Sequence, residues 1–450
     1  MKNIFKHRIT KILLGMISVV ILVLLPSFTY WRNWRVESIP DVGEPFDVEA
    51  YLKSYDEIEE NPFDTLKGAS TKYWEIIRAQ NHTIANTNPW VLWEQRSVAD
   101  RSYLAATDPV VDLWLTTIDL SSGYEVSPHE FNFESELPVT QDSRDISRLI
   151  LIRVAHLMEE GKTSEAIELY GQYLKLSLRF RDGIMISNLV GIAEYALFWE
   201  SLSIFLQHDS LTIEELQRLR AIVIEHHDKC QPVSVNLRME YMMIYNSLHQ
   251  ETDSRWINSI SREDEVAQRV LNLIFQNWYR YCDLPAWERP PVHEHKCNSF
   301  SLSGIWNQDT AASQCQFNYF VDEQEEQILE AYHRLASTKG TFNLALISIR
   351  QLMKAYDRDL SRRESTLTMI ALAIYHREHG TFPQTLEELV PQYLEAVPLN
   401  RDVNPGWQVE PGMPISYQVE EGVAKLRFDI PFLNSDLHPP GKPSYTRPFE

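Results

Sequence analysis

An uncharged apolar run near the N-terminus is the feature that most restricts this chain. The run extends from Ile12 to Tyr30 and contains nineteen residues. A helix that rises about 1.5 Å per residue needs this length to cross about 30 Å of hydrocarbon. Four basic residues precede the run, and only two follow it before acidic residues dominate, which favours a cytoplasmic N-terminus. We therefore predict that residues 1–35 form a cytoplasmic tail and a transmembrane anchor.

The anchor also predicts where the rest of the protein lies. Everything after it is expected in the periplasm, as the ectodomain of a single-pass protein of the bacterial cytoplasmic membrane. A cleavable signal peptide is the alternative interpretation, but no Ala-x-Ala site follows the run, and only Ser27 and Thr29 are small residues near its end. We expect an uncleaved signal anchor, in which residues 12–30 hold the chain in the membrane.

The remainder of the chain is strongly acidic. The whole sequence carries a formal net charge of −21, yet its first 35 residues contain six basic groups and no acidic one. The rest therefore has 36 basic against 63 acidic groups. Because a surface of this charge repels phosphate backbones, we expect no nucleic acid among the partners. The expected partners are the membrane, through residues 12–30, and an unknown protein.

Composition and periodicity predict a mainly α-helical protein. Only 15 of the 450 residues are glycine, which favours helices with short connections. Apolar residues recur at helical spacing, and Gly161 separates two such segments as a helical hairpin. Residues 184–206 are apolar but contain Glu194 and Glu200, whose charges disfavour a second membrane span. We expect a buried core helix there, with each glutamate satisfied locally.

The predicted domains follow one another along the chain. Residues 36–65 form an acidic stalk punctuated by prolines, and residues 66–320 form an ectodomain of stacked helical hairpins. This ectodomain ends in a cysteine-rich loop, 282–320, that lacks periodicity. Residues 321–430 are expected to be a small α+β C-terminal module with a β-hairpin. Residues 431–450 are expected to be an irregular tail.

The C-terminal module resembles a known structural unit. Helices are expected at 342–358 and 361–379, followed by the sequence HGTFP, a capping box that begins at Thr385, and a short helix from Leu386 to Leu394. This pattern is similar to the end of the long helix and the following turn in type II secretion pseudopilins. The resemblance implies a packed helix-turn-hairpin module and favours an assembly role at the envelope.

Taken whole, the chain also resembles uncharacterised single-pass envelope proteins of planctomycete type. The segments that carry this likeness include the anchor, the sequence IPDVGEPFDVEAY that begins at Ile39, and EHGTFPQTLEELVPQYL near the C-terminus. The resemblance spans most of the chain and implies no known activity.

The four cysteines are candidates for disulfides in a chain that leaves the cytoplasm. Cys282, Cys297 and Cys315 belong to the loop at 282–320, which predicts at least one local bridge. Cys230 is available for the remaining partner. Four cysteines allow three pairings, and the sequence leaves all three open.

The competing interpretation of this loop is a metal site. His293, His295 and Cys297 alternate along the sequence, so a strand would present them as candidate ligands on one face. The segment from His226 to Cys230 gathers similar residue types. Neither segment has zinc-finger spacing.

No catalytic signature is present in the sequence. It lacks a glycine-rich phosphate loop, a Gly-x-Ser-x-Gly nucleophile elbow and a His-Glu-x-x-His motif. We predict no catalytic residue and no cofactor, and a non-catalytic interaction or assembly role at the envelope. The alternative is an extracytoplasmic enzyme, with a metal held by the Cys/His loop at 282–320.

Overall fold

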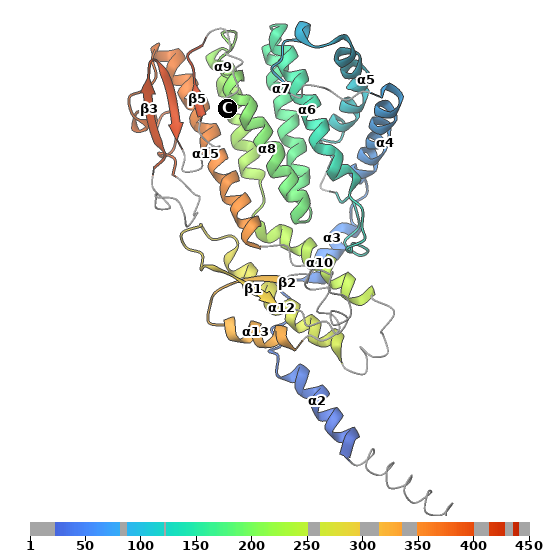
Figure 1. The fold of residues 1–450 in the computed structure, drawn as a ribbon. Coiled ribbons are helices and arrows are strands. Elements are labelled where there is room, and N and C mark those ends of the chain that lie inside the picture. Colours follow the sequence, from blue (N-terminus) through green and yellow to red (C-terminus); the bar gives the residue numbers. More distant parts are fainter. Residues whose placement is uncertain are drawn as a thin grey trace, which may run out of the picture. The chain divides into compact units, whose positions relative to one another are not determined.

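The structure, a computed structural model, describes residues 23–81, 88–120, 123–250, 262–297, 315–334, 349–399, 414–427 and 435–440. In this part of the chain the protein is mainly helical, with one two-stranded and one three-stranded antiparallel sheet (Figure 1). The chain forms two compact units, and each unit combines segments that are distant in sequence.

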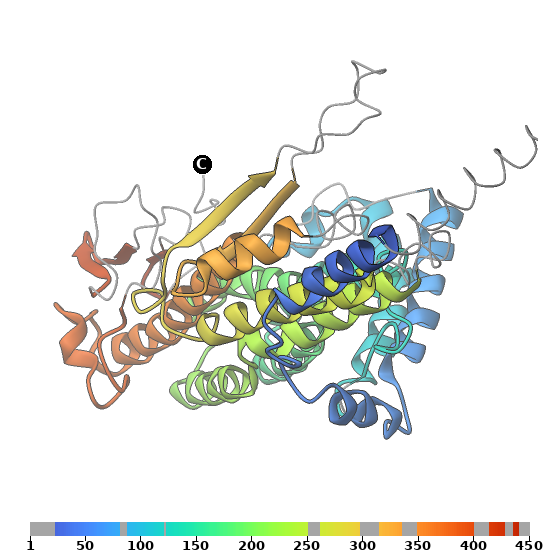
Figure 2. The same ribbon diagram turned by 90° about the horizontal axis from the view of Figure 1, so that it is seen from below.

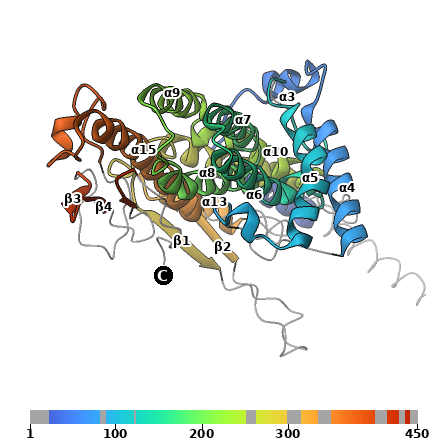
Figure 3. The same ribbon diagram turned by 90° about the horizontal axis from the view of Figure 1, so that it is seen from above.

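The larger unit contains residues 49–242, 281–289 and 347–450. Its helices are α3 (Val48–Asp56), α4 (Pro62–Gln80), α5 (Val98–Leu115), α6 (Pro138–Glu159), α7 (Thr163–Arg181), α8 (Met185–Phe205), α9 (Ile213–Lys229), the first half of α10 (Val233–Gln250) and α15 (Ile349–His379), with a short 3₁₀ turn, η2 (Trp93–Gln95). Helices α4 to α9 and α15 pack side by side as one stack (Figures 1 and 3). A single hydrophobic core runs through this stack.

Local sequence signals explain several of these elements. Gly161 has φ +74° and joins α6 to α7, which confirms the predicted helical hairpin, because only glycine adopts this backbone conformation freely. Thr212 and Glu215 form a capping box at the start of α9, in which each side chain binds the other residue's backbone N–H. Helix α8 carries buried residues around its whole circumference and is the predicted core helix.

The C-terminal part of the larger unit packs against the end of α15. A 3₁₀ turn, η4 (Leu386–Leu389), inserts Leu386 and Leu389 into the core. The strands β3 (Ser416–Glu420) and β4 (Val423–Arg427) form the predicted hairpin, with Val419 opposite Ala424. A third strand, β5 (Ser435–Leu437), pairs with β4 and completes the sheet.

Four expectations differ from the structure in this region and in the cysteine-rich loop. Residues 349–379 form one helix where two were predicted, because no glycine or proline interrupts them. The expected helix from Leu386 to Leu394 is only the turn η4, since Pro391 cannot continue a helical hydrogen-bond ladder. The tail predicted to be irregular contains β5, whose residues Ser435 and Leu437 are buried against β4. The loop at 282–320 contains two strands.

The smaller unit contains residues 1–48, 243–280 and 290–346. Its described elements are α2 (Leu25–Glu37), the second half of α10, α12 (Glu263–Tyr281), β1 (Val292–Cys297), β2 (Cys315–Phe320) and α13 (Glu325–His333). Figure 2 shows β1 and β2 as an antiparallel pair beside α13. On α12, the Asn277 side chain bonds both the N–H and the C=O of Phe320, and Trp278 Nε1 donates to the carbonyl of Asn318 at 2.9 Å. These bonds fix one end of β2 to α12.

A buried ion pair holds the C-terminal end of helix α2 to the rest of the smaller unit. Arg35 donates to the Glu263 carboxylate at 2.5 Å and to the carbonyl of Arg334 at 2.7 Å. N-terminal to Arg35, the helix becomes apolar and exposed: seven of the twelve exposed large hydrophobic residues in the described chain lie between Val23 and Trp34. Most of the predicted span, residues 12–22, lies outside the described residues. Within the described ranges, no helix has both the length and the apolar character of a membrane span.

Candidate functional site

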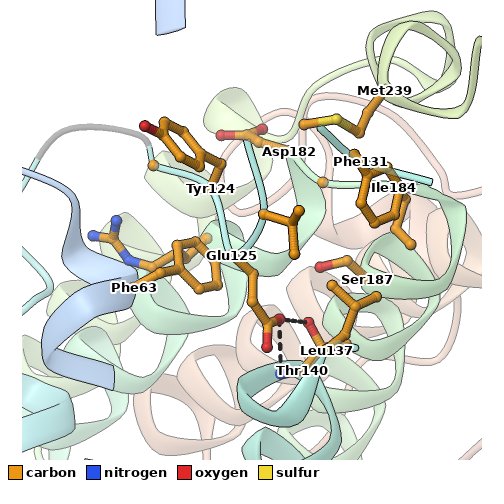
Figure 4. A pocket seen from close by; sticks show the side chains of 14 residues that line it. Phe63, Tyr124, Glu125, Phe131, Leu137, Thr140, Asp182, Ile184, Ser187 and Met239 are labelled. Carbon is orange, nitrogen blue, oxygen red and sulfur yellow. Dashed lines mark hydrogen bonds between the residues drawn. The ribbon is translucent and has the colours of Figure 1, made fainter. Parts of the chain in front are cut away.

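Two cavities in the larger unit are candidates for a binding site, and their volumes separate them. The lining of the first cavity combines aromatic and aliphatic side chains with polar ones, which include Glu125, Asp182 and Ser187 (Figure 4). Its volume is about 30 Å³. This space suits about two water molecules and is too small for an organic ligand.

Glu125 has a structural role beside this small cavity. Its carboxylate accepts hydrogen bonds from the backbone N–H groups of Val139 at 2.6 Å and Thr140 at 3.1 Å, and from the Thr140 hydroxyl at 2.6 Å. These N–H groups belong to the first turn of α6, where the helix supplies no acceptor. Burial raises the pKa of Glu125, and the hydrogen bonds oppose that rise. Glu125 is thus a cap of α6, which accounts for its burial.

The second cavity lies between α9 and α15 and has a volume of about 510 Å³. Sites for small ligands are typically of this size. We call this cavity the α9–α15 groove. Its lining consists of Arg220, Ile224, His227 and Asp228 from α9, of Leu360, Arg363, Glu364, Leu367 and Thr368 from α15, and of residues 394–399.

A buried ion network lies next to the groove. The Asp359 carboxylate accepts two parallel hydrogen bonds from the Arg181 guanidinium, at 2.7 and 2.8 Å, and a third from Arg363 at 2.6 Å. Asp359 is fully buried, and both arginines are at least nine-tenths buried. Burial raises the pKa of Asp359, but the two arginines outweigh burial and hold this pKa well below its ordinary value. Arg363 therefore lines the groove with its orientation fixed by a buried carboxylate.

A second chain of hydrogen bonds ends at the groove in His227. The Thr366 hydroxyl donates to the carbonyl of Arg362 at 2.8 Å, so it accepts the proton of the Tyr195 hydroxyl at 2.9 Å. The Tyr195 oxygen must then accept from His227 Nε2, which lies 2.7 Å away. This assignment places the imidazole proton on Nε2 and leaves Nδ1 as an acceptor.

The electrostatics of His227 argue against acid–base catalysis. Burial, assisted by the nearby Arg363, lowers the pKa of His227 to about 3. An efficient general base has a pKa near the working pH, so a ring this weakly basic is unsuited to proton abstraction at neutral pH. The groove thus presents fixed polar groups that are able to bind a ligand.

The neighbouring thiol and imidazole are equally unsuited to chemistry. Cys230 Sγ lies 3.9 Å from His226 Nδ1, and His226 Nε2 lies 3.2 Å from the Ser177 hydroxyl. Burial lowers the pKa of His226 well below its ordinary value and raises that of Cys230, so both groups are neutral at pH 7. A thiol without thiolate character is a poor nucleophile and a poor metal ligand. His226 is therefore a core residue with the half-buried Cys230 beside it, whereas Asp228 and Lys229 of the same segment are exposed.

The candidate metal ligands of the cysteine-rich loop, His293, His295 and Cys297, all lie on β1. His293 is exposed on β1 and stacks on the Tyr319 ring with the centroids 5.5 Å apart. The side chains of His295 and Cys297 lie outside the described part of the chain. Among the residues that the structure describes, no cluster of three or more His, Cys, Asp or Glu side chains is arranged for a metal.

The four predicted disulfide cysteines also differ in their surroundings. Cys282 is buried in the larger unit, Cys230 is half-buried, and both are free thiols. No disulfide is found between cysteines whose side chains are described. The backbone places Cys297 on β1 and Cys315 on β2.

Sequence reasoning missed the groove and its ion network. Arg181 and Asp359 are 178 residues apart, and neither stands in a recognisable motif. The one local signal is that Asp359 and Arg363 are four residues apart in α15, a spacing at which opposite charges meet on a helix.

Glu194, which the sequence places in the core helix, is fully buried, and burial raises its pKa to about 7.

The larger unit is thus a stack of helices with a groove between α9 and α15. Neither the family models, nor the curated proteins, nor the solved structures contain a match to this chain.

Proposed function

We propose that this is a membrane-anchored protein of the bacterial envelope whose ectodomain binds a protein partner in the α9–α15 groove, without catalysing a reaction. The observation that carries the proposal is the groove itself. Its volume of about 510 Å³ is suitable for a ligand. Two of its polar groups, Arg363 and His227, are held in place by buried partners. The lowered pKa of His227, about 3, makes this ring unsuited to proton transfer at neutral pH.

The composition of the groove favours a peptide segment as its ligand. Ile224, Leu360 and Leu367 provide apolar surface, while Arg220 and Asp228 provide charges of opposite sign on α9. A segment of a partner protein offers both apolar and charged side chains, and fixed groups reduce the entropy lost on binding it. The resemblance of the C-terminal module to type II secretion pseudopilins supports an assembly role for such binding.

A photo-crosslinking amino acid tests whether the groove binds a protein partner. We expect p-benzoylphenylalanine at Ile224, in the groove, to crosslink the full-length protein to a protein partner in cells. The same amino acid at Val98, which is 75% exposed on α5, is the matched control and should give no such adduct. Adding Leu367→Trp should fill the groove and abolish the crosslink while the melting temperature stays unchanged. Equal adducts from both positions, or none from Ile224, would contradict the proposal.

The apolar N-terminal segment supports membrane attachment. Residues 12–22 continue the apolar sequence that α2 begins to expose, and Phe28, Tyr30, Trp31 and Trp34 are exposed aromatic residues at its C-terminal end. Exposed Trp and Tyr side chains of this kind favour the boundary between hydrocarbon and water. Burying such a surface in lipid removes apolar area from water and is strongly favourable.

Fractionation tests the attachment and its direction. The full chain should remain in the membrane fraction after a high-salt wash, whereas a variant lacking residues 1–30 should be released. A reporter that is active only in the periplasm should be active when it is fused after residue 60. Release of the intact full chain by salt would show that no apolar anchor holds it, and an inactive periplasmic reporter would reverse the proposed orientation.

A further inference from the structure

We propose that Cys297 and Cys315 form a disulfide across β1 and β2, while Cys230 and Cys282 remain thiols. The oxidised state in the cell rests on the proposed location outside the cytoplasm, because disulfides persist in oxidising compartments. The choice of partners rests on the backbone alone. Four cysteines allow three complete pairings and several states with a single bond. The backbone selects one of the single-bond states.

The strand register places the two cysteines directly opposite each other. β1 and β2 are antiparallel, with Val292 opposite Phe320 at one end of the ladder and Cys297 opposite Cys315 at the other. Directly opposed residues in such a pair have Cα atoms about 4.5 to 5.5 Å apart. Disulfides require Cα separations of about 4.4 to 6.8 Å, so this register satisfies the requirement without backbone movement.

The other two cysteines lack this arrangement. Cys230 at the end of α9 and Cys282 after α12 are both free thiols in the larger unit. Burial raises the pKa of each thiol, which lowers the fraction of thiolate that attacks a disulfide. Cys230 and Cys282 are therefore slow to form disulfides with each other, with Cys297 or with Cys315.

A disulfide at this position would stabilise the end of the β1–β2 ladder that lies away from the contacts with α12. Asn277 and Trp278 of α12 fix residues 318–320 of β2, which is the end of the ladder far from Cys315. An isolated two-stranded pair is only marginally stable. A bond between Cys297 and Cys315 joins the strands at the opposite end of the ladder and closes a ring that includes residues 298–314.

The bond forms by thiol–disulfide exchange with an external oxidant. The thiolate of one cysteine attacks the disulfide of a thiol oxidoreductase, and a mixed disulfide forms as one oxidoreductase sulfur leaves. The second cysteine then attacks its neighbour's sulfur, which creates the Sγ–Sγ bond. The two cysteines lose two electrons and two protons in total, and the oxidoreductase is reduced to a dithiol.

Peptide mapping of the full-length protein, isolated without reductant after trapping with an alkylating agent, tests the pairing. We expect one disulfide-linked peptide pair containing Cys297 and Cys315, and two free thiols after denaturation. Cys297→Ser should leave three thiols, whereas Cys230→Ser should leave one and keep the bond. A linked pair of any other composition would overturn the inference.

Oxidation in vitro separates this inference from the proposed location. If the isolated protein has four thiols but glutathione disulfide then joins Cys297 to Cys315 selectively, the pairing is upheld and the extracytoplasmic location is wrong. If glutathione disulfide joins other cysteines or none, the pairing is wrong whatever the compartment. Zinc that binds stoichiometrically to the reduced protein and is lost in Cys297→Ser would likewise overturn the pairing in favour of a metal site.

Discussion

Replacing Asp359 with asparagine should lower the free energy of unfolding by about 3 to 5 kcal/mol, as is typical when one partner of a buried ion pair is removed. Asp359 and Arg181 are both almost completely buried and share two hydrogen bonds. Asparagine keeps the shape of the side chain but leaves the guanidinium groups of Arg181 and Arg363 without a counter-charge. Chemical denaturation of the ectodomain measures this loss.

A surface ion pair provides the matched control for Asp359→Asn. Asp145 and Arg148 are 2.7 Å apart on α6, but their side chains are 50% and 30% exposed. Water screens this pair, so Asp145→Asn should cost well under about 1 kcal/mol. If both variants unfold at the same denaturant concentration, the buried network does not stabilise the larger unit. Arg363 lines the groove, so Asp359→Asn should also weaken the crosslink from Ile224.

The Glu240→Gln variant should gain stability relative to the unchanged chain as the pH rises from acidic to alkaline values. Glu240 on α10 is completely buried. Burial raises its pKa to about 8, and the backbone N–H of Met185 offsets this only in part. The pKa of an unfolded glutamate is near 4.5, so between pH 4.5 and 8 the folded state binds more protons than the unfolded state.

The sign of the effect follows from this difference in bound protons. Stability must fall as the pH rises through that window, by an amount of about 4 kcal/mol for a shift of this size. Glutamine cannot ionise, so the free energy of unfolding of Glu240→Gln minus that of the unchanged chain should increase by this amount between pH 4.5 and pH 9.

The comparison needs a difference between two proteins because other groups titrate as well. His227 has a folded pKa of about 3 against an ordinary value of 6.5, so its contribution to stability is lost as the pH falls below 6.5. This histidine is unchanged in the variant, and its effect cancels. Glu387→Gln, which alters an exposed glutamate on η4, is the control and should show no pH-dependent difference. A constant difference between Glu240→Gln and the unchanged chain across this range would show that Glu240 ionises freely in the folded protein.

Several elements of the fold could be predicted from short stretches of sequence. The capping boxes at Thr212 and Thr385, the glycine turn at Gly161 and the hairpin around Gly422 are all present. Each depends on residues within a few positions of one another, whose hydrogen bonds and backbone conformations are decided locally. For the same reason, the apolar character of α8 was sufficient to predict a core helix.

The cysteine-rich loop shows where local patterns lose their predictive value. Residues 292–297 have no regular alternation of apolar and polar residues, and residues 315–319 alternate over only five positions, yet the two segments pair as β1 and β2. Their pairing depends on α12, which supplies Asn277 and Trp278 to β2 from about forty residues earlier in the chain. Strand pairing of this kind gains its free energy from tertiary contacts, which a scan along the sequence does not contain.

The sequence by itself determined the helical class, the apolar N-terminal run, the acidic charge of the remaining chain and the local turns. Only the tertiary structure decided that Arg181 meets Asp359 across 178 residues, that α9 and α15 enclose a groove, and that Cys297 lies opposite Cys315. The physical reason is that propensities, caps and turns act over a few residues. Buried ion pairs, cavities and strand registers instead arise from the packing of distant segments, and many different sequences satisfy the same packing.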